Sequence, residues 1–300
     1  MLQKFDKRNS GIKVFIGGKI YNREKARVSV FDSSVQGGDA VWEGLRVYNG
    51  NIFCFDKHVK RLQESAKTLA FADIPDFRYI RKAVPSTLKE NKMRDGVHIR
   101  LTLTRGEKIT SGMDPRLNTK GSCLIVLAEW KNPVYDNKYG IKLITSSVRR
   151  NSPSFLDSKI HHNNLLNNIL AKIQANESNA DDALMLDENG FVSETNATNV
   201  FMVKEGKLHT PDTTSCLPGI TRGLVLDIAS SLGIKFAKRQ ISLSEFYNAD
   251  EVFTSGTMGE LTPVFEIDGR KIINNSKSVL LKTLKKEYEK LKYKIGEKLP

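Results

Sequence analysis

Lys159 lies in a stretch of polar residues that no apolar pattern of the sequence requires. Asp157 or Ser158 can cap a helix over residues 159–176, because apolar residues recur there at spacings of three and four and predict an inward face. These apolar positions are Leu165, Leu166, Ile169, Leu170 and Ile173. In a polar, partly enclosed pocket a lysine can lose its proton and act as a nucleophile. The alternative is a solvated lysine beside a helix cap.

A second polar segment has Glu194 at its centre. Residues 182–201 suggest a strand, a turn, this polar segment and a further strand, and Leu217-Pro218-Gly219-Ile220-Thr221-Arg222 follows. Gly219 is expected to open a helix, and amides at a helix N-terminus bind anions. The amides of Ile220 and Thr221 therefore form a natural cradle for an anionic group. An exposed carboxylate in a turn is the alternative for Glu194.

Length and composition predict a globular chain with a sizeable core. Its 300 residues are 39% hydrophobic, which suits two domains better than one. No apolar run reaches the length of a membrane span and the first residues lack the apolar core of a signal peptide, so we expect a cytoplasmic protein without membrane partners. Cys54, Cys123 and Cys216 lack metal-ligand spacing, which predicts reduced thiols and no metal site.

The formal charge of +13 would suit a nucleic-acid partner. Its distribution argues against that function. Across residues 276–300 the lysines punctuate a helical pattern and form a solvated face. The apolar stripe of that pattern is Leu281, Leu284, Tyr288, Leu291 and Ile295. The sequence also lacks zinc-finger spacing and aromatic-basic RNA motifs, so we expect no nucleic-acid binding.

The first half of the chain alternates between strand and helix patterns. Strands are expected at residues 13–20, 27–31, 44–48, 52–55, 97–104 and 122–128. Asn49-Gly50 predicts a hairpin between the third and fourth of these strands. Asp56 can cap a helix to about residue 70, and Pro75-Asp76 begins another. The strand at 122–128 is nearly all apolar and is expected to be central in its sheet.

The second half alternates again and predicts an α+β domain. Strands are expected at residues 141–146, around Leu184, Val200 and Leu208, and at 234–239, 251–254 and 264–267. Helices are expected at 159–176, 219–232 and 244–247. Residues 131–137 have turn composition. We therefore predict a small N-terminal α/β domain at 1–130, a linker at 131–138 and a larger C-terminal α+β domain at 139–300, with small ligands held in a cleft between domains.

The three polar stretches around Lys159, Glu194 and Gly219 resemble, in order and spacing, the class IV (fold-type IV) pyridoxal phosphate-dependent enzymes. That family includes branched-chain aminotransferases, D-amino acid aminotransferases, (R)-amine transaminases and aminodeoxychorismate lyase. The resemblance extends from about Val14 to Gly269. It implies an α+β, two-domain fold of the D-amino acid aminotransferase-like type.

The resemblance also implies roles for individual residues toward the cofactor, pyridoxal 5′-phosphate. Lys159 would form the Schiff base, and Glu194 would be the anion that keeps the ring nitrogen protonated. Thr254-Ser255-Gly256-Thr257 resembles the family's second phosphate-side loop. Arg61 matches an arginine that reaches the phosphate across the domain interface, with a solvated helix arginine as the alternative. The implied cofactor-binding set besides Lys159 is Glu194, Arg61, Leu217, Ile220, Thr221, Thr257, Asn196 and Ala197.

Substrate recognition is implied for residues of the N-terminal domain. Residues 41–48 resemble the Phe-Glu-Gly-Ile-Arg segment of branched-chain enzymes, with Trp42 in place of phenylalanine. Arg100 matches an arginine of those enzymes that assists carboxylate binding, whereas Arg105 resembles the carboxylate arginine of D-amino acid enzymes. Asn164 and His98 each replace a tyrosine usual in the family. The implied substrate-binding set is Trp42, Gly44, Arg100, Arg105, Trp130 and Met258.

The implied reaction is transamination in two half-reactions between an amino acid and a 2-oxo acid, in a homodimer or a higher homo-oligomer. Branched-chain L-amino acids with 2-oxoglutarate are the first expectation, and D-amino acids are the second. Aminodeoxychorismate lyase is the third. It is disfavoured because the asparagine-arginine pair common in its lysine motif is Asn163-Asn164 here.

Overall fold

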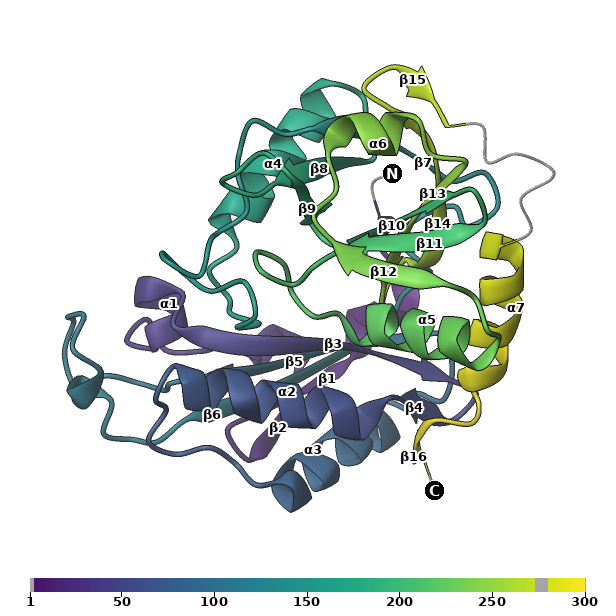
Figure 1. Cartoon of the computed structure of the whole chain (residues 1–300). Helices are drawn as coiled ribbons and strands as arrows, with labels where there is room; N and C mark the ends of the chain where they lie inside the picture. The colour runs from purple at the N-terminus through teal and green to yellow at the C-terminus, as the bar shows by residue number, and fades with distance from the viewer. Residues whose placement is uncertain (1–2, 273–279, 300) are drawn as a thin grey trace. The chain divides into compact units, whose positions relative to one another are not determined.

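Six strands from the first part of the chain and one from residues 296–298 form a seven-stranded antiparallel sheet (Figure 1). The computed structural model describes residues 3–272 and 280–299. In spatial order the strands are β16 (Gly296–Lys298), β4 (Asn51–Phe53), β3 (Ala40–Tyr48), β5 (Val97–Thr104), β6 (Cys123–Trp130), β1 (Lys13–Ile16) and β2 (Lys19–Asn22). The predicted Asn49-Gly50 hairpin is present, and both residues have the positive φ that its tight turn requires. The strand predicted at 122–128 is β6, which is paired on both sides.

Helices α2 (Phe55–Thr68) and α3 (Phe77–Glu90) cover one face of this sheet (Figure 1). Asp76 caps α3 as predicted, because its carboxylate accepts the Tyr79 amide at 2.7 Å. The predicted cap of α2 at Asp56 is wrong. That helix follows Cys54, whose φ of 53° already turns the chain, so Asp56 falls within the first helical turn. Short helical turns complete this part of the fold: η1 (Lys7–Gly11), η2 (Arg23–Lys25), α1 (Ser33–Gly37) and η3 (Pro115–Leu117).

No strand forms at residues 27–31, contrary to the sequence-based expectation. The segment leads into α1, whose N-cap Asp32 accepts the Ser34 amide at 2.8 Å. Val30 and Phe31 are exposed, at 71% and 46%. The segment has β-branched residues, but no neighbouring strand pairs with it, so its side chains have no sheet surface on which to pack.

The second sheet is mixed, which confirms the predicted α+β class (Figure 1). In spatial order its strands are β12 (Phe236–Arg239), β11 (Lys207–Pro211), β10 (Asn199–Lys204), β13 (Glu251–Gly256), β14 (Glu260–Ile267), β7 (Ile141–Thr145), β8 (Asp182–Leu186) and β9 (Val192–Thr195), and β15 (Arg270–Lys271) pairs with β14. Pairs β11·β12, β14·β7 and β7·β8 are parallel. The central strands are buried on both faces, because helices pack against them.

Four helices belong to the second sheet: α4 (Leu166–Glu177), α5 (Ile220–Ser231), α6 (Leu243–Tyr247) and α7 (Leu280–Leu291). On α7 the predicted apolar stripe is buried through Leu281, Leu284 and Tyr288. Its lysines are exposed except Lys285, which is half-buried and donates to the Asn137 carbonyl at 2.7 Å. The helix ends at Leu291, so Ile295 lies beyond it. The start of the expected pattern, residues 276–279, lies outside the described residues.

The chain divides into two compact units. The C-terminal unit contains Pro133–Lys159 and Leu165–Leu291, and the N-terminal unit contains the residues up to Asn132, Ile160–Asn164 and the residues from Lys292 onward. A single boundary at 131–138 therefore misses two later segments that belong to the N-terminal unit, Ile160–Asn164 and the residues from Lys292 onward. Residues expected as a linker are also packed, since the buried Tyr135 hydroxyl donates to Asp182 within the C-terminal unit.

The helix expected from Lys159 is wrong in its start and in its buried face. It begins seven residues later, as α4, without a side-chain cap. The preceding residues 160–164 instead run along β3, where the Trp42 amide donates to the His161 carbonyl at 2.9 Å and the Asn163 amide to the Ala40 carbonyl at 2.8 Å. On α4 the small residues Ala171 and Ala175 are buried. Its large apolar residues are exposed instead: Leu166, Ile169, Leu170 and Ile173.

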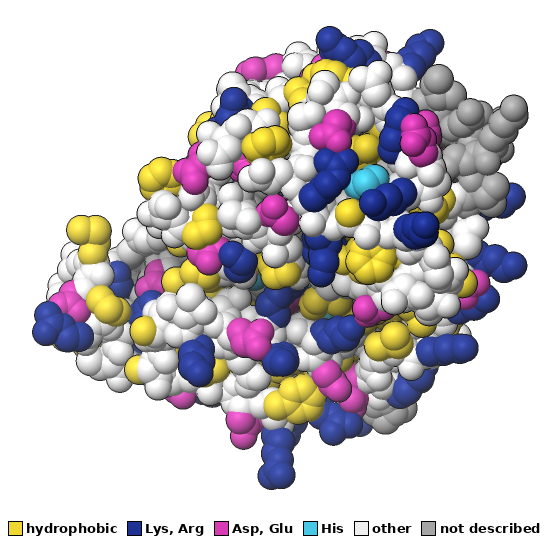
Figure 2. All heavy atoms as spheres, in the orientation of Figure 1, with side chains coloured by type: hydrophobic (Ala, Val, Ile, Leu, Met, Phe, Trp, Pro, Cys, Tyr) yellow, Lys and Arg dark blue, Asp and Glu magenta, His cyan; other side chains and the backbone are white. Residues whose placement is uncertain are grey.

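Charged side chains are dispersed on the face of the molecule that Figure 2 draws. On the face drawn in Figure 2, lysine and arginine side chains are interspersed with aspartate, glutamate and apolar groups. Within the described residues, no helix has the length and apolarity needed to cross a bilayer. The same residues contain no group of three or more His, Cys, Asp and Glu side chains that could hold a metal ion.

Candidate active site

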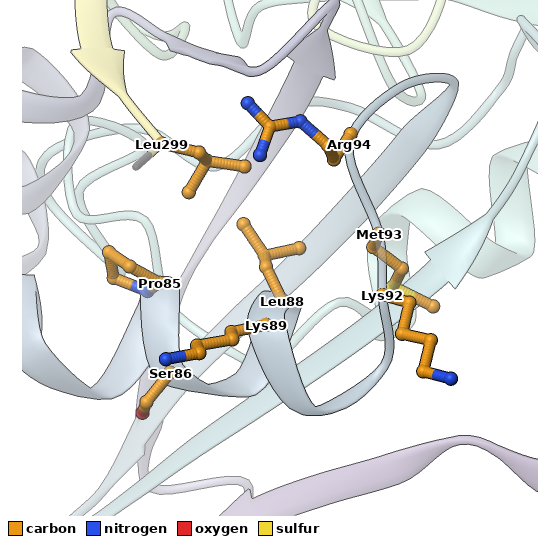
Figure 3. A pocket seen from close by; sticks show the side chains of 8 residues that line it. All are labelled: Pro85, Ser86, Leu88, Lys89, Lys92, Met93, Arg94 and Leu299. Carbon is orange, nitrogen blue, oxygen red and sulfur yellow. The ribbon is translucent and has the colours of Figure 1, made fainter.

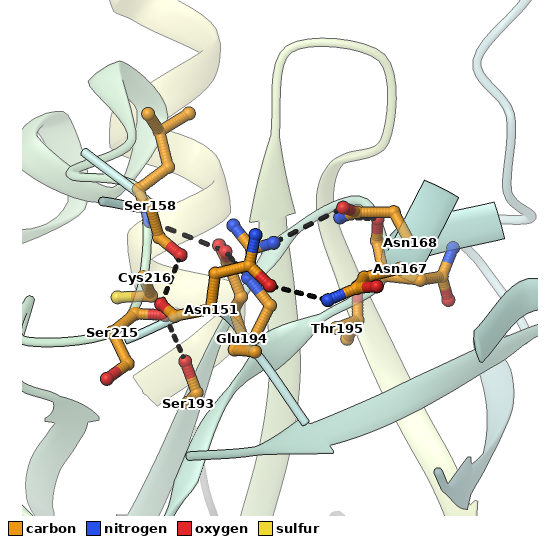
Figure 4. A network of polar contacts seen from close by, with 12 residues as sticks. Asn151, Ser158, Asn167, Asn168, Ser193, Glu194, Thr195, Ser215 and Cys216 are labelled. Carbon is orange, nitrogen blue, oxygen red and sulfur yellow. Dashed lines mark hydrogen bonds and ion pairs between the residues drawn. The ribbon is translucent and has the colours of Figure 1, made fainter. Parts of the chain in front are cut away.

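Glu194 on β9 is a buried carboxylate with fixed partners (Figure 4). Its Oε1 lies 2.7 Å from Nε of Arg150, and Asn199 Nδ2 donates to its Oε2 at 3.1 Å. The Leu217 amide approaches Oε1 at 3.4 Å. Burial raises the pKa of Glu194, while the nearby Arg150 guanidinium opposes that shift. The result is an acid held in one orientation, as a group that faces a cofactor must be.

The backbone leading to Lys159 is anchored beside Glu194 (Figure 4). Ser158 is 1% exposed and donates its hydroxyl to the Asn151 carbonyl at 2.8 Å. Asn167 of α4 donates to the Asn151 side chain at 2.5 Å. Residues 149–154 therefore contribute both the partner of Glu194 and the anchor of the lysine segment.

Lys159 itself lies in a turn and not at a capped helix. Asp157 accepts its amide at 2.9 Å, so the capping chemistry expected of Asp157 is used for this turn. The Lys159 side chain is 45% exposed, with Nζ 3.7 Å from Asp157. Its amine is thus accessible at the end of an anchored segment.

The N-terminus of α5 lies next to the Glu194 cluster through Asn199. Asn199 Nδ2 donates both to Glu194 and to the Leu217 carbonyl, the latter at 2.9 Å. A Cβ at Gly219 would lie 2.0 Å from Asn199 Oδ1, so only glycine fits at this N-cap. The first amides of α5, including those of Ile220 and Thr221, have no partner within a helix. Together they form an anion cradle tied to the buried acid.

The end of β13 offers further donors in the same unit. The hydroxyls of Thr254 and Ser255 are buried and find no hydrogen-bond partner among the described residues. A Cβ at Gly256 would lie 2.8 Å from Thr198 Cγ2, so the chain passes close to the Glu194 segment there. Buried hydroxyls without partners are costly, and an anionic ligand would satisfy such donors. Thr257 and Met258 follow in the turn after this strand.

Asn196 uses its side chain and its backbone carbonyl for hydrogen bonds within the C-terminal unit. Its side chain accepts the Ala183 amide at 2.8 Å and donates to Asp182 at 3.3 Å. Its carbonyl accepts Asn168 Nδ2 at 2.8 Å, and Ala197 directs its own amide to Thr195 Oγ1 at 3.2 Å. These contacts make Asn196 a scaffold for the Glu194 loop.

In the N-terminal unit Arg61 belongs to a buried cluster around Glu43, which is 0% exposed. Arg61 forms a bidentate pair with it, through Nε to Oε1 at 2.6 Å and NH2 to Oε2 at 2.7 Å. His58 Nδ1 lies 2.6 Å from Oε2, and His161 Nδ1 lies 3.1 Å from Oε1. Burial would raise the pKa of Glu43, but Arg61 and His161 outweigh it and hold that pKa well below its ordinary value. The Arg61 charge is therefore fixed in place.

Trp42, Gly44 and Arg100 come together in the N-terminal unit, as the resemblance implied. The Arg100 guanidinium lies 3.6 Å from the centre of the Trp42 ring and donates to Asn163 Oδ1 at 2.7 Å. Gly44 is opposite Arg100, and a Cβ there would lie 3.3 Å from His98 Nε2. Burial lowers the pKa of Arg100 to about 10.

Arg105 and Trp130 have structural partners of their own. Arg105 pairs with Asp39, with Nε 2.5 Å from Oδ2, and donates to the carbonyls of Leu69 and Ala70 at 2.8 and 3.1 Å. Trp130 lies beneath the Arg8 guanidinium at 4.9 Å. Within the described residues, no hydrogen bond, ion pair or ring contact is found between either side chain and Trp42 or Arg100.

Sequence reasoning assigned no individual role to Arg150, Asn199, Glu43, His58 or His161, although Arg150 and His161 belong to the polar stretches on either side of Lys159. A signal did exist for Arg150, which stands in a polar segment with no apolar reason to be there. The histidines gave no comparable signal, because His161 is 118 residues from Glu43 in the chain.

A two-unit α+β fold with a buried acid tied to a helix N-terminus defines a class of cofactor-dependent enzymes. Residues 40–267 match the family described as Amino-transferase class IV, and the chain belongs to that family. Pyridoxal 5′-phosphate is the cofactor of class IV aminotransferases. The residues of this chain fit that cofactor, because an anchored lysine, a buried acid, unpartnered hydroxyls and an anion cradle are all present.

Several similar proteins bear names of branched-chain enzymes, and a relative from Bacillus licheniformis at 31% identity is named D-alanine aminotransferase. The chain is 56% identical to branched-chain-amino-acid aminotransferase-like protein 2 of Arabidopsis thaliana over 97% of its own length and 52% of that protein. It thus spans about half the length of this relative. It is 32% identical to the branched-chain-amino-acid aminotransferase of Pseudomonas aeruginosa, over 92% and 91% of the two chains. The branched-chain aminotransferase of the thermophilic archaeon Thermoproteus uzoniensis, solved with norvaline, superposes with a TM-score of 0.85 at 30% identity, covering 94% of this chain and 95% of that one.

Proposed function

We propose that this protein transfers amino groups between amino acids and 2-oxo acids with pyridoxal 5′-phosphate, and that branched-chain L-amino acids and 2-oxoglutarate are its substrates. The observation that carries the proposal is the buried Glu194, oriented by Arg150 and joined through Asn199 to the N-terminus of α5. The names of the relatives support the branched-chain substrate.

Each cofactor-side residue has a defined task in this proposal. Pyridoxal phosphate, when bound, supplies a ring that accepts the electron pair released at the amino acid's α-carbon. Glu194 holds a proton at the ring nitrogen. The Lys159 amine, carried by an anchored segment, would move the proton from the amino acid's α-carbon to the cofactor's C4′. The amides of Ile220 and Thr221 would hold the phosphate together with the Thr257 loop, whereas the Arg61 guanidinium is already occupied by Glu43.

Arg100 is the proposed substrate-carboxylate residue. Its guanidinium is oriented by Trp42 and Asn163, whereas that of Arg105 is occupied by Asp39 and two carbonyls. This difference between the two arginines supports an enzyme specific for L-amino acids over one specific for D-amino acids.

Arg100→Ala is therefore expected to raise KM for L-leucine by roughly 30-fold or more, because a charge-assisted carboxylate contact is lost. Arg105→Ala is expected to act on folding instead. It breaks a largely buried ion pair, so the free energy of unfolding should fall by roughly 2 kcal/mol or more. Steady-state kinetics and urea unfolding of both variants separate these effects. Activity on D-alanine that depends on Arg105, with none on L-leucine, would contradict the L-specific assignment.

The substrate proposal is tested by one set of assays. The purified chain with pyridoxal phosphate is incubated with L-leucine, D-alanine or aminodeoxychorismate. Release of L-glutamate from 2-oxoglutarate with L-leucine is the expected result. D-Glutamate formed with D-alanine would support a D-amino acid enzyme, and pyruvate formed from aminodeoxychorismate would support a lyase.

A cytoplasmic location is also proposed, and it is supported by the three cysteines, all of which are free.

A homodimer is the proposed assembly, supported by exposed apolar side chains on both units. Those of the C-terminal unit lie on one face of α4: Leu166, Ile169, Leu170 and Ile173. Those of the N-terminal unit lie around α1 and the loop before η3: Val28, Val30, Phe31, Val35, Ile109 and Met113. Apolar patches of this kind are typical of surfaces that a partner covers.

Replacing Leu170 and Ile173 together with glutamate is expected to convert the dimer to a monomer, because two charges would be buried in an apolar contact. Sedimentation velocity measures the mass, and circular dichroism checks that α4 remains folded. Lys282→Glu combined with Lys286→Glu, at two exposed positions of α7 in the same unit, is the matched control and should leave the mass unchanged. A monomeric wild-type chain, or a double variant of unchanged mass, would rule out α4 as the dimer surface.

A further inference from the structure

Arg100 differs from three other arginines of the chain in the charge of its partner. Those three each pair with a carboxylate: Arg61 with Glu43, Arg105 with Asp39 and Arg150 with Glu194. Among the described residues Arg100 forms no ion pair, and its guanidinium donates instead to a neutral amide, Asn163 Oδ1, at 2.7 Å. Burial lowers the pKa of Arg100. The side chain therefore carries a half-buried positive charge without a counter-charge from the described part of the chain.

Asn163 is held in place because its segment pairs with β3. Its amide donates to the Ala40 carbonyl at 2.8 Å, and the residue before it, His162, forms an antiparallel bridge with Val41. The side-chain oxygen therefore reaches Arg100 from a fixed backbone. A single acceptor engages one N–H group of a guanidinium and leaves its other donors available for a ligand.

The Trp42 ring, which lies against Arg100, is fixed by the same segment. Trp42 Nε1 donates to the His162 carbonyl at 3.1 Å, and the centre of the His161 ring lies 4.2 Å from that of Trp42. His161 is held in turn by Glu43, whose Oε1 lies 3.1 Å from its Nδ1. The ring is thus a second fixed partner of the guanidinium that carries no negative charge.

The lysines that line a cavity of about 560 Å³ at the C-terminal end of α3 are arranged differently (Figure 3). The amines of Lys89 and Lys92 point away from each other, so they do not converge on one anion. Arg100 is not among the residues that line this cavity. A carboxylate site needs donors that are held in one place, and this requirement favours Arg100 over the lysines of the cavity.

We propose that Asn163 is a positioning residue that fixes Arg100 for the substrate carboxylate and keeps the charge of Arg100 uncompensated. This inference rests on the proposed function, in which Arg100 receives that carboxylate. An amide oxygen accepts a hydrogen bond from a guanidinium as a carboxylate does, but it adds no negative charge. An aspartate at position 163 would form an ion pair like those of the other three arginines, and the substrate would have to displace it.

Asn163→Asp is the direct test of this inference. Its KM for L-leucine should rise by about 30-fold or more while kcat changes by less than about threefold, because the new ion pair competes with the substrate for Arg100. Its melting temperature should not fall, because the half-buried guanidinium gains a counter-charge. Asn163→Ala removes the acceptor without adding charge and should raise KM about fivefold. Steady-state kinetics and thermal unfolding followed by circular dichroism measure these effects.

A binding measurement that needs no turnover separates this inference from the proposed function. Isothermal titration of the enzyme loaded with pyridoxal phosphate compares 4-methylpentanoate, a branched carboxylate without an amine, with its neutral counterpart 4-methylpentanamide. The wild-type enzyme is expected to bind the carboxylate at least about tenfold more tightly than the amide, and Asn163→Asp should lose that preference while its affinity for the amide is unchanged. Asn22→Asp, at an exposed position of β2 in the same unit, makes the same change of charge and should leave KM and the preference unchanged.

Three results would overturn the inference. An equal preference for the carboxylate in the wild-type enzyme and in Asn163→Asp would refute the role of Asn163 and leave the transaminase proposal intact. A lowered melting temperature of Asn163→Asp with a parallel loss of kcat would show that Asn163 serves only the fold. No preference for the carboxylate in the wild-type enzyme would remove Arg100 as its receptor, and turnover of L-leucine in the same preparation would show whether the proposed function fails with it.

Discussion

Replacing Lys159 with alanine is expected to abolish transamination while the fold is retained. The amine is the proposed group that moves the α-proton, so its loss should lower kcat by about 10⁴-fold or more. Stability should change little, because the side chain is 45% exposed and its pair with Asp157, at 3.7 Å, is a surface contact. Single-turnover assays with L-leucine, followed by cofactor absorbance, measure the effect.

The controls for Lys159 separate chemistry from charge and folding. Lys207→Ala removes an exposed lysine from β11 in the same unit and should leave kcat unchanged. Added methylamine should restore part of the activity of Lys159→Ala, because a small free amine can carry the proton in place of the side chain. Near-normal turnover of Lys159→Ala would contradict the assignment of Lys159 as the group that moves the α-proton.

Features set by neighbouring residues were predictable from the sequence. Asn49-Gly50 specifies a tight hairpin, and Asp76 caps α3 through an amide three residues away. Gly219 marks the start of α5 for a similar reason, since an N-cap depends on a few successive residues. These signals are local, so they survive without knowledge of the tertiary structure.

The start of α4 depends on residues that are distant in the chain, so it could not be predicted from the neighbouring sequence. Residues 160–164 have a sequence compatible with a helix, yet they pair with β3, about 120 residues earlier in the chain. Helical spacing predicted that the face with the large apolar residues packs inward, and this prediction is wrong. The small residues Ala171 and Ala175 face the sheet, and the larger ones are left exposed.

The Glu43 cluster shows the same limit for polar residues. Arg61 lies 18 residues after Glu43 in the chain, and His161 lies 118 residues after Glu43. Neither spacing matches a motif that could be recognised in the sequence. The resemblance identified Arg61 because it matches a residue in a motif. The carboxylate that fixes it became visible only when the strand, the helix and the segment after Lys159 were brought together.

Glu194→Gln is expected to lower kcat by about 10²- to 10⁴-fold, with little loss of cofactor affinity. Glutamine keeps the size of the side chain and can still accept the Asn199 amide, but it removes the negative charge that would hold a proton at the ring nitrogen. The α5 cradle is unchanged, so the phosphate should still bind. Stopped-flow half-reactions and a cofactor titration measure the two quantities separately.

Two further variants distinguish a catalytic charge from a structural one. Glu194→Gln also leaves the Arg150 guanidinium buried without its carboxylate, which is expected to lower the free energy of unfolding by roughly 3–5 kcal/mol. Adding Arg150→Met to Glu194→Gln should recover part of that stability and none of the turnover, because an apolar side chain removes the unpaired charge but restores no anion. Glu177→Gln, at the exposed end of α4, should change neither. Recovery of turnover in the double variant would mean that Glu194 serves the fold and that another carboxylate faces the ring nitrogen.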